Sequence, residues 1–483
     1  MFGAASLNEY PFLVGGEWRT GAAPLEVRFP YTGEIVALVH QAGEQDRSDA
    51  AETAAEAFKT TRDLSSAERS RILSDLADRV KERSPEFVDI LVLEGGKTRS
   101  FAEQEVARAC TTLRTSAEEA GRINGELLPL DWSAEMAGRF GITRRVPLGP
   151  VLGITPFNFP LNLACHKLGP AIASGNPFIL KPASATPVSS LLLGKLALET
   201  GLPPEALSVI PCPASIAEGL ARDPRIAFLS FTGSPAVGWR LRQIAGRKKV
   251  MLELGGNAAV IVHSDANIPY AVSRIVTGGF SNAGQVCISV QRVFFENRIY
   301  DRALEMILKH VAALKTGDPR NPDTDIGPMI SAGAATRAET IVREAVQQGA
   351  TLLCGGKRTG ALFTPAVLAD TQPDMRVSCE EAFAPIITVN KYGEFGEALS
   401  EANRSEFGLQ MGIFTNHLPF VLQAFREAEV GGVMVNDIPT FRADQMPYGG
   451  TKASGTGKEG PRYAIREMTE EKLLVINPLG GLQ

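Results

Sequence analysis

A regular alternation of short apolar runs and helix-like segments, between residues 149 and 256, constrains the fold of this chain more than any other feature. The apolar runs are PVLGITP, PFILKPA, LSVIPC, IAFLSFTGS and KVMLELGG. Two of the segments between them end at a glycine, Gly175 and Gly201, as helices often do. Strands separated by helices of this length predict βαβ units and a parallel sheet, which we interpret as a doubly wound nucleotide-binding domain.

Four polar or glycine-rich turns directly follow strands of this predicted sheet. They are TPFN (155–158), KPAS (181–184), FTGS (231–234) and ELGG (253–256). The carboxyl ends of parallel strands lie at one edge of a sheet, and ligands of α/β proteins bind beyond that edge. We therefore expect the four turns to gather at one edge and to form a ligand site there.

The rest of the chain predicts further α/β structure. Segments 46–60, 65–84 and 105–125 have apolar residues at helical spacing. From about Asn257 a second alternation predicts another α/β domain, with Cys287 at the end of a helix-like segment that begins near Asn267. The tail KLLVINPLGG (472–481) is strand-like but has no obvious local partner. It should pair with another domain or another subunit, because an unpaired strand edge is a liability.

Length and composition limit the classes of protein that the chain can belong to. Its 483 residues exceed one compact core, so we expect two or three domains. The apolar fraction of 44% and the charged fraction of 21% are ordinary for a globular protein. The net charge is −5 without a long block of one sign, so no nucleic-acid partner is expected.

Targeting and metal signals are not visible in the sequence. The five histidines and six cysteines are dispersed, so we predict neither a metal site nor a disulfide framework. The first 21 residues do not resemble a signal peptide, and prolines and charged residues interrupt the apolar stretch 151–173. We expect no membrane partner and a cytoplasmic location.

Three residues suggest a chemistry when they are taken together, although each alone has an ordinary structural explanation. Cys287 could be a core thiol, Glu253 a solvated carboxylate at a strand end, and Asn158 a residue that holds a turn. In the functional interpretation, the Cys287 thiolate attacks an aldehyde, and the Asn158 amide with a nearby backbone N–H stabilises the oxyanion. A nicotinamide oxidises the adduct to a thioester, and Glu253 activates the water that hydrolyses it. The glycines of AGQVC and ELGG should let the backbone approach a ligand closely.

The motifs PFNFP, KPAS, FTGS, LELGG, GQVC, EEAFAP and MPYGG, in this order, resemble the aldehyde dehydrogenase superfamily over nearly the whole chain. The interval of 34 residues between Glu253 and Cys287 also resembles the family. The resemblance implies an α/β fold with a Rossmann-like parallel-sheet cofactor domain (1–122 and 144–255) and an α/β catalytic domain (256–455). It also implies a small β oligomerisation element (123–143 and 456–483) and a homodimer or homotetramer.

The resemblance further implies the roles of individual residues. Cys287 is implied as the nucleophile, Glu253 as the general base and Asn158 as the oxyanion donor. Lys181 is implied to bind the adenosine ribose, and Glu381 the nicotinamide ribose. The whole set of implied cofactor-binding residues is Thr155, Pro156, Lys181, Ser184, Gly233, Ser234, Gly238, Leu254, Glu381 and Phe383.

The sequence departs from the family pattern at two positions. Ser184 stands where many NAD-specific members have a glutamate, three residues after the ribose-binding lysine. A carboxylate there would repel the extra phosphate of NADP, whereas a serine would not, so we predict that NADP is accepted as well as NAD. Ala384 stands where glycine is commoner, and we attach no mechanistic meaning to it.

Several segments resemble one branch of the family, which includes lactaldehyde, phosphonoacetaldehyde and non-phosphorylating glyceraldehyde-3-phosphate dehydrogenases. They include ITPFNFPLNLACHKLGPA, SNAGQVCISVQRVF and PTFRADQMPYGG. This resemblance implies a small polar or anionic aldehyde as substrate. Arg108, His166 and Arg442 are the residues that we predict near an anionic group, although each also fits a solvated or structural role. A histidine at 166, where succinate semialdehyde dehydrogenases carry an arginine nearby, weakens that particular substrate.

Two other functions remain open at this point. One is a CoA-acylating relative, in which CoA takes the thioester; Glu253 argues against it, because no base for water is then needed. The other is a catalytically silent binding or structural protein, which the complete set of Cys287, Glu253 and Asn158 disfavours. The sequence does not select the aldehyde, the preference between NAD and NADP, or dimer against tetramer.

Overall fold

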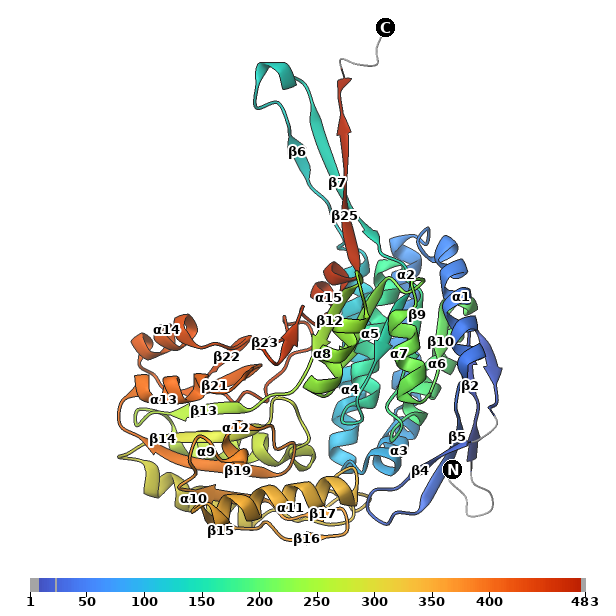
Figure 1. Cartoon of the computed structure of the whole chain (residues 1–483). Helices are drawn as coiled ribbons and strands as arrows, with labels where there is room; N and C mark the ends of the chain where they lie inside the picture. The colour runs from blue at the N-terminus through green and yellow to red at the C-terminus, as the bar shows by residue number, and fades with distance from the viewer. Residues whose placement is uncertain (1–7, 22–23, 479–483) are drawn as a thin grey trace.

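The structure is a computed structural model that describes residues 8–21 and 24–478. These residues form two α/β lobes, and a narrow β arm projects from one of them (Figure 1). Residues 1–7, 22–23 and 479–483 lie outside the described residues. The predicted cofactor domain, the predicted oligomerisation element and the tail segment 472–481 each extend into one or more of these ranges.

The first lobe is built around an eight-stranded sheet with the order β24-β12-β11-β8-β9-β10-β2-β3. From β12 to β10 the neighbouring strands are parallel. All four residues of β8 are buried. Gly153 in this strand packs closely against Phe178, because a Cβ at this position would lie only 2.5 Å from the Phe178 ring. The strands are β2 (Phe12–Val14), β3 (Glu17–Arg19), β8 (Val151–Ile154), β9 (Phe178–Lys181), β10 (Leu207–Val209), β11 (Phe228–Thr232), β12 (Lys249–Glu253) and β24 (Gly455–Thr456).

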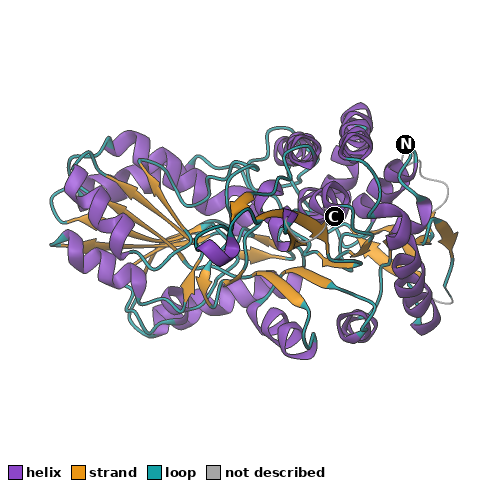
Figure 2. Cartoon of the chain, turned by 90° about the horizontal axis from the view of Figure 1, so that it is seen from above, coloured by secondary structure: helices purple, strands orange, loops and turns teal. Residues whose placement is uncertain are grey.

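Helices cover both faces of this sheet, as Figure 2 shows from above. One hydrophobic cluster joins the sheet to α2 (Ser66–Glu82), α3 (Ser84–Gly95), α4 (Arg99–Ala120), α5 (Pro160–Ser174), α6 (Val188–Leu198) and α15 (Pro461–Glu467). A second cluster on the opposite face joins it to α1 (Glu44–Thr61), α7 (Ala214–Arg222) and α8 (Pro235–Ile244). The predicted doubly wound α/β architecture is therefore confirmed.

The prediction that four turns share one edge of the sheet is also confirmed. Strands β8, β9, β11 and β12 end at Ile154, Lys181, Thr232 and Glu253, and they are parallel neighbours in the order β12-β11-β8-β9. The four turns that follow them therefore start at the same edge.

The second lobe contains a seven-stranded sheet with the order β15-β18-β19-β14-β13-β21-β22. All neighbours are parallel except the edge pair β15 and β18. The strands are β13 (Ala258–Val262), β14 (Val290–Glu296), β15 (Thr351–Cys354), β18 (Ala366–Ala369), β19 (Ile386–Tyr392), β21 (Gln410–Phe414) and β22 (Gly432–Val435). Helices α9 (Ile268–Phe280), α10 (Tyr300–Ala312) and α11 (Ala332–Gln347) pack in one cluster, and α13 (Phe395–Asn403) and α14 (Leu418–Glu427) in another.

The helix before Cys287 is shorter than predicted. It ends at Phe280, because Asn282 and Ala283 adopt left-handed backbone conformations with φ of 51° and 53°. A short 3-10 turn, Ser281–Gly284, follows, and Cys287 lies in the loop between this turn and β14. The placement of Cys287 at a helix end was therefore wrong.

The arm consists of β25 (Thr469–Ile476), β7 (Phe140–Pro147) and β6 (Leu127–Pro129). β25 pairs antiparallel with β7 along its whole length, so the tail strand finds its partner in a distant part of the same chain. The predicted domain boundary between residues 143 and 144 falls inside β7. Among the described helices, none is long and apolar enough to cross a membrane.

The remaining elements are short. They are β1 (Asn8–Tyr10), β4 (Pro24–Arg28), β5 (Ile35–His40), β16 (Arg358–Thr359), β17 (Leu362–Phe363), β20 (Phe407–Gly408), β23 (Thr451–Lys452), α12 (Arg376–Cys379) and the 3-10 turns Ala134–Met136 and Pro204–Ala206.

Candidate active site

A cavity of about 610 Å³ is lined by residues of both lobes. The first lobe contributes the turns after β8, β11 and β12, and the second contributes the loop that carries Cys287. Of the residues predicted from the sequence, those in the cavity wall are Arg108, Pro156, Asn158, Gly233, Ser234, Leu254, Cys287, Glu381, Phe383 and Arg442. The structure thus brings together most of the predicted nucleophile, cofactor and substrate residues.

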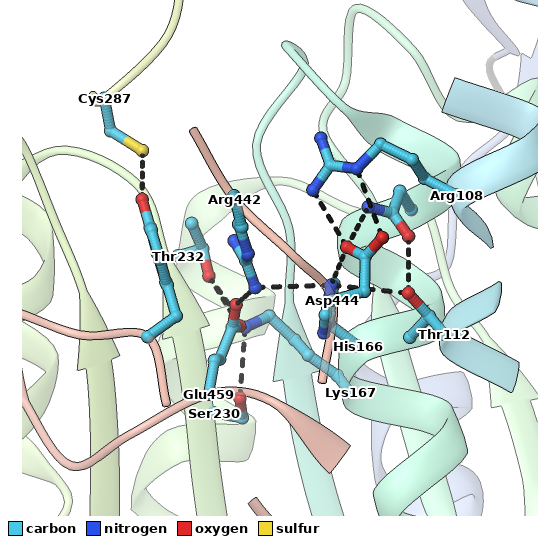
Figure 3. Close-up of polar contacts among 12 residues, drawn as sticks. Arg108, Thr112, His166, Lys167, Ser230, Thr232, Cys287, Arg442, Asp444 and Glu459 are labelled. Atoms are coloured by element: carbon cyan, nitrogen blue, oxygen red, sulfur yellow. Dashed lines mark hydrogen bonds and ion pairs between the residues drawn. The ribbon is translucent and has the colours of Figure 1, made fainter. Parts of the chain in front are cut away.

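The Cys287 thiol is partly buried, and its Sγ lies 2.9 Å from Oη of Tyr448, the contact drawn from Cys287 in Figure 3. Burial raises the pKa of the thiol to about 12, against the smaller lowering effect of the hydrogen bond with Tyr448. The loop is held by close backbone contacts. A Cβ on Gly284, at φ +68°, would lie 2.1 Å from the Ala384 carbonyl oxygen.

Gly256 and Gly284 of the two motifs also allow close contacts within the chain, while the predicted close approach to a ligand stays a prediction. A Cβ on Gly256 would lie 2.1 Å from the Cys287 carbonyl oxygen, just as one on Gly284 would meet Ala384. These glycines let segments of the chain approach each other, and through those contacts they fix the loop that presents the thiol.

Glu253 is the last residue of β12 and is almost completely buried. Neither carboxylate oxygen has a hydrogen-bond partner. Burial and the nearby Glu459 carboxylate raise its pKa well above the ordinary value. Glu253 is not part of the cavity wall, but the next residue, Leu254, lines it and donates its N–H to the Ser454 carbonyl at 2.9 Å.

Asn158 lies in the turn between β8 and α5, where it is buried. Its Nδ2 donates to the Gln285 carbonyl at 3.0 Å, which ties the turn to the Cys287 loop. An amide nitrogen carries two hydrogens, so one remains for an oxyanion in the cavity. The Oδ1 atom has no hydrogen-bond partner.

A further group of residues in the cavity wall could hold a dinucleotide. Ser234 is the N-cap of α8, but its hydroxyl makes no capping bond, so the helix N-terminus presents free donors. Glu381 accepts the Gly256 N–H at 2.9 Å through Oε1, and a Cβ on Gly255 would lie 2.6 Å from Oε2. Burial raises the Glu381 pKa to about 7. The Phe383 ring packs edge-on against Phe157 at a centroid distance of 5.8 Å.

Four predicted cofactor residues lie outside the cavity wall: Thr155, Lys181, Ser184 and Gly238. Lys181 ends β9 beside Ile154, and burial lowers the pKa of its ammonium group. Ser184 is exposed in the following loop, and Gly238 is buried against Leu254, where a Cβ would lie 2.3 Å from Cδ2. All four belong to the turns at the same sheet edge or to the helix that follows one, so their positions fit the adenosine half of a dinucleotide.

His166 does not take the predicted position next to the substrate. His166 follows Asn158 by eight residues, a spacing that predicts one shared helical face. The helix begins only at Pro160, after Asn158, so the two do not share a face. The imidazole is completely buried, and its Nε2 lies 3.0 Å from Asp444 and 3.2 Å from Arg442, contacts that Figure 3 draws. His166 is not in the cavity wall. His166 is therefore a core histidine that contacts Arg442 in the cavity wall but does not line the cavity itself.

The two arginines do line the cavity, and both are held by carboxylates. Arg108 on α4 donates to Asp444 at 2.8 and 3.3 Å and is about one-third exposed. Arg442 is buried, donates to Glu459 at 3.0 Å, and lies over the Tyr448 ring at 3.7 Å. The Nε of Arg442 has no hydrogen-bond partner.

Sequence reasoning missed four residues of this site: Lys167, Asp444, Tyr448 and Glu459. Lys167 and Glu459 form a completely buried ion pair at 2.8 Å, and Lys167 also donates to the Thr232 hydroxyl at 2.7 Å (Figure 3). Tyr448 lies within the MPYGG motif, so that motif was the available signal for it. Within the described ranges, no group of three or more histidine, cysteine, aspartate or glutamate side chains could hold a metal ion.

Comparison with known proteins agrees with this geometry. Residues 18–474 match the model of the aldehyde dehydrogenase family, so the chain belongs to that family. It is 45% identical over 478 residues to 3-sulfolactaldehyde dehydrogenase from Priestia aryabhattai, covering 99% of this chain and 100% of that protein. The resemblance inferred from the motifs is confirmed, and the chain is an NAD(P)-dependent aldehyde dehydrogenase.

Two solved structures extend the comparison to the whole fold. Aldehyde dehydrogenase 21 from Physcomitrella patens, in complex with the reaction product succinate, is 41% identical with a TM-score of 0.97, covering 99% of this chain and 100% of that one. Glyceraldehyde-3-phosphate dehydrogenase from Methanocaldococcus jannaschii, complexed with NADP, is 35% identical with a TM-score of 0.91, covering 94% and 99%.

Proposed function

We propose that this enzyme oxidises a small aldehyde with an anionic group at its other end to the corresponding carboxylate. The observation that carries the proposal is that Arg108 and Arg442 line the same cavity as Cys287 and Asn158. Two guanidinium groups favour a sulfonate, phosphonate or carboxylate, which each can bind with paired hydrogen bonds. The names of the relatives support this choice, since sulfolactaldehyde and succinate are both anionic.

In the proposed reaction the Cys287 sulfur attacks the carbonyl carbon, and a C–S bond forms. The Asn158 amide and a backbone N–H beside Cys287 donate to the resulting oxyanion. When bound, the nicotinamide supplies the two-electron oxidising power that turns such an adduct into a thioester. Arg108 and Arg442 hold the far end of the substrate, so that the carbonyl is positioned over the thiol.

Glu253 is proposed to act on the thioester. Its raised pKa and unpaired oxygens suit a general base, because the carboxylate is free to accept a proton from water. The hydroxide oxygen bonds to the acyl carbon, the C–S bond breaks, and the Cys287 thiolate leaves. A CoA-acylating enzyme needs no such base, and a silent relative needs neither the base nor the thiol.

We further propose that the predicted cofactor residues hold NAD or NADP. Glu381 would bind the nicotinamide ribose with Phe383 and Leu254 beside it. Ser234 and the start of α8 would hold the pyrophosphate, helped by Gly233 and Gly238. Thr155, Pro156 and Lys181 would line the adenosine half. The Glu381 carboxylate in the cavity wall and the start of α8, where Ser234 makes no side-chain capping bond, support this fit.

Acceptance of NADP is proposed from Ser184, which is exposed and carries no charge. A ratio of NAD to NADP catalytic efficiency above roughly a thousand, or ~4 kcal/mol of discrimination, would reject it. The variant Ser184→Glu should lower the efficiency with NADP about tenfold or more and leave that with NAD nearly unchanged.

The arm supports a proposal about self-association into a homodimer or homotetramer. Its apolar side chains are exposed, with Leu127 70%, Leu473 52% and Leu474 58% accessible. Exposed apolar surface of this kind marks protein interfaces. Light scattering should give at least the dimer mass, and the double substitution Leu473→Asp with Leu474→Asp should lower it. The six unpaired cysteines support a cytoplasmic location, which cell fractionation tests.

The substrate proposal is tested with aldehydes of matched length that end in a sulfonate, carboxylate, hydroxyl or methyl group, with and without CoA. We expect kcat/KM to be about tenfold or more higher for the anionic members. Arg108→Gln should raise KM for these and change the neutral members little, whereas Arg320→Gln, a surface arginine paired with Asp318, should change neither. Preference for the methyl member would reject the anionic substrate, and turnover that requires CoA would favour the acylating enzyme.

A further inference from the structure

Tyr448 is a buried phenol in direct contact with the sulfur of Cys287. Its Oη lies 2.9 Å from Sγ, and the residue is only 2% exposed. Its backbone is fixed by a two-way bridge to Glu459: the Tyr448 N–H donates to the Glu459 carbonyl at 3.0 Å, and the Glu459 N–H donates back at 2.6 Å. The phenol oxygen is therefore held at the sulfur by a paired backbone.

Arg442 fixes the plane of the tyrosine ring. Its guanidinium carbon lies 3.7 Å from the ring centroid, and Glu459 holds the same guanidinium at 3.0 Å. A cation over an aromatic face is attracted to it, and it draws electron density away from the ring and its substituents. The charge of Arg442 lowers the pKa of the buried phenol, against the larger raising effect of burial, so the O–H is a stronger hydrogen-bond donor than it would be without the cation.

The direction of the hydrogen bond follows from which group ionises first. Burial raises the pKa of the Cys287 thiol to about 12 and that of the Tyr448 phenol well above its ordinary value. Glu253 and Glu381 also act on the thiol and raise its pKa, whereas Arg442 lowers it. A thiol ordinarily ionises before a phenol, and the contact between the two lowers the pKa of the Cys287 thiol while it raises that of the Tyr448 phenol. The phenol O–H therefore donates to the thiolate.

We propose that Tyr448 is a further catalytic residue, whose O–H donates a hydrogen bond to the Cys287 sulfur whenever that sulfur is a thiolate. The proposal rests on the proposed role of Cys287 as nucleophile. When the thiol ionises, the S–H bond breaks and the proton leaves to water in the cavity, while Tyr448 retains its own proton. When the C–S bond forms, the sulfur loses its charge and the hydrogen bond weakens. When the thioester is hydrolysed, Cys287 leaves as a thiolate, and the Tyr448 O–H donates to it again.

The test measures the thiolate of Cys287 directly and needs no aldehyde turnover. Iodoacetamide alkylates thiolates, and trypsin cleavage after Arg274 and Arg292 releases a peptide in which Cys287 is the sole cysteine. In Tyr448→Phe we expect the alkylation rate at pH 8 to fall about tenfold or more, as if the pH profile had moved up by about one unit. The value of kcat should fall with it, with a smaller change in KM.

Matched controls separate this role from a structural one. Tyr300→Phe removes a phenol that bonds the Val389 carbonyl at 3.4 Å in the second lobe, and it should leave the alkylation profile unchanged. If Tyr448→Phe does not fold, 3-fluorotyrosine at position 448 preserves the shape and strengthens the donor. It should then move the profile to lower pH.

The two proposals fail in different ways. An unchanged alkylation profile in Tyr448→Phe, or with 3-fluorotyrosine at that position, would overturn the role of Tyr448 and leave that of Cys287 intact. Full aldehyde oxidation by Cys287→Ala would overturn the proposed function itself.

Discussion

Glu253 and Glu459 are two buried carboxylates of the same site, and they differ in their hydrogen-bond and ion-pair partners. Glu459 forms ion pairs with Lys167 at 2.8 Å and with Arg442 at 3.0 Å. Glu253 has no hydrogen-bond partner on either oxygen. Although burial raises the pKa of both, the two cations lower that of Glu459 below the ordinary value, whereas the charge of Glu459 raises that of Glu253 further.

The difference separates a carboxylate that holds the site together from one that is available for chemistry. A buried charge that is paired stays ionised and fixes its neighbours, because its removal leaves other charges without partners. A buried carboxyl without partners titrates closer to neutrality and can exchange a proton. The charge of the paired Glu459 therefore helps to raise the pKa of the unpaired Glu253.

The largest expected effect comes from removing the unpaired carboxylate. Glu253→Gln should lower kcat for aldehyde oxidation by about 10² to 10⁴, because the general base for thioester hydrolysis is lost. Single-turnover measurements should then show one equivalent of reduced nicotinamide followed by slow release of acid. Glu467→Gln, a change in α15, serves as control and should retain activity. Normal turnover in Glu253→Gln would show that the unpaired carboxylate is not the base.

Removing the paired carboxylate should act on stability. Glu459→Gln leaves Lys167 and Arg442 buried without a counter-charge, and we expect the free energy of unfolding to fall by about 3–5 kcal/mol. Denaturant unfolding measures the change, and Glu253→Gln in the same series should show no loss of stability. Equal losses in the two variants would remove the distinction between the carboxylates.

The dependence of stability on pH should differ in sign for the two groups. The folded pKa of Glu459 is lowered, so its contribution is present above the unfolded pKa and is lost as pH falls through the folded value. The folded pKa of Glu253 is raised, so it disfavours the folded state progressively as pH rises above the unfolded value. Glu253→Gln should therefore gain stability relative to the natural chain between pH 5 and 8, by up to about 1.4 kcal/mol per unit of raised pKa.

The smallest effect should come from Lys458, a half-buried lysine whose charge lowers the pKa of Glu253. Lys458→Met should move the acidic limb of the pH–rate profile upward by about half a unit or less, because the interaction is one of several and is partly screened. A shift to lower pH would contradict the assignment of that limb to Glu253.

Local patterns were enough to predict the sheet edge. The turns after β8, β9, β11 and β12 follow from strand length and helix periodicity, which depend on neighbours in sequence. Cys287, Glu253 and Asn158 were identified because they lie within or beside such motifs.

What the sequence did not predict depends on contacts between distant residues. Lys167 and Glu459 are 292 positions apart, and Cys287 and Tyr448 are 161 apart. His166 was misplaced for the same reason, because its surroundings are set by Asp444, 278 positions away. The spacing from Asn158 could not show that the helix begins only at Pro160, nor that Asp444 contacts the imidazole.

The bridge between Tyr448 and Glu459 has a consequence for the order in which the enzyme becomes competent. Arg442, Tyr448 and Glu459 all lie near the end of the chain, long after Asn158, Glu253 and Cys287. A nascent chain on the ribosome that ends before Arg442 already carries the thiol, the base and the oxyanion donor. It lacks Tyr448, which contacts the sulfur, and the ion pair of Arg442 with Glu459, so the reactive centre is completed only after Glu459 has been synthesised.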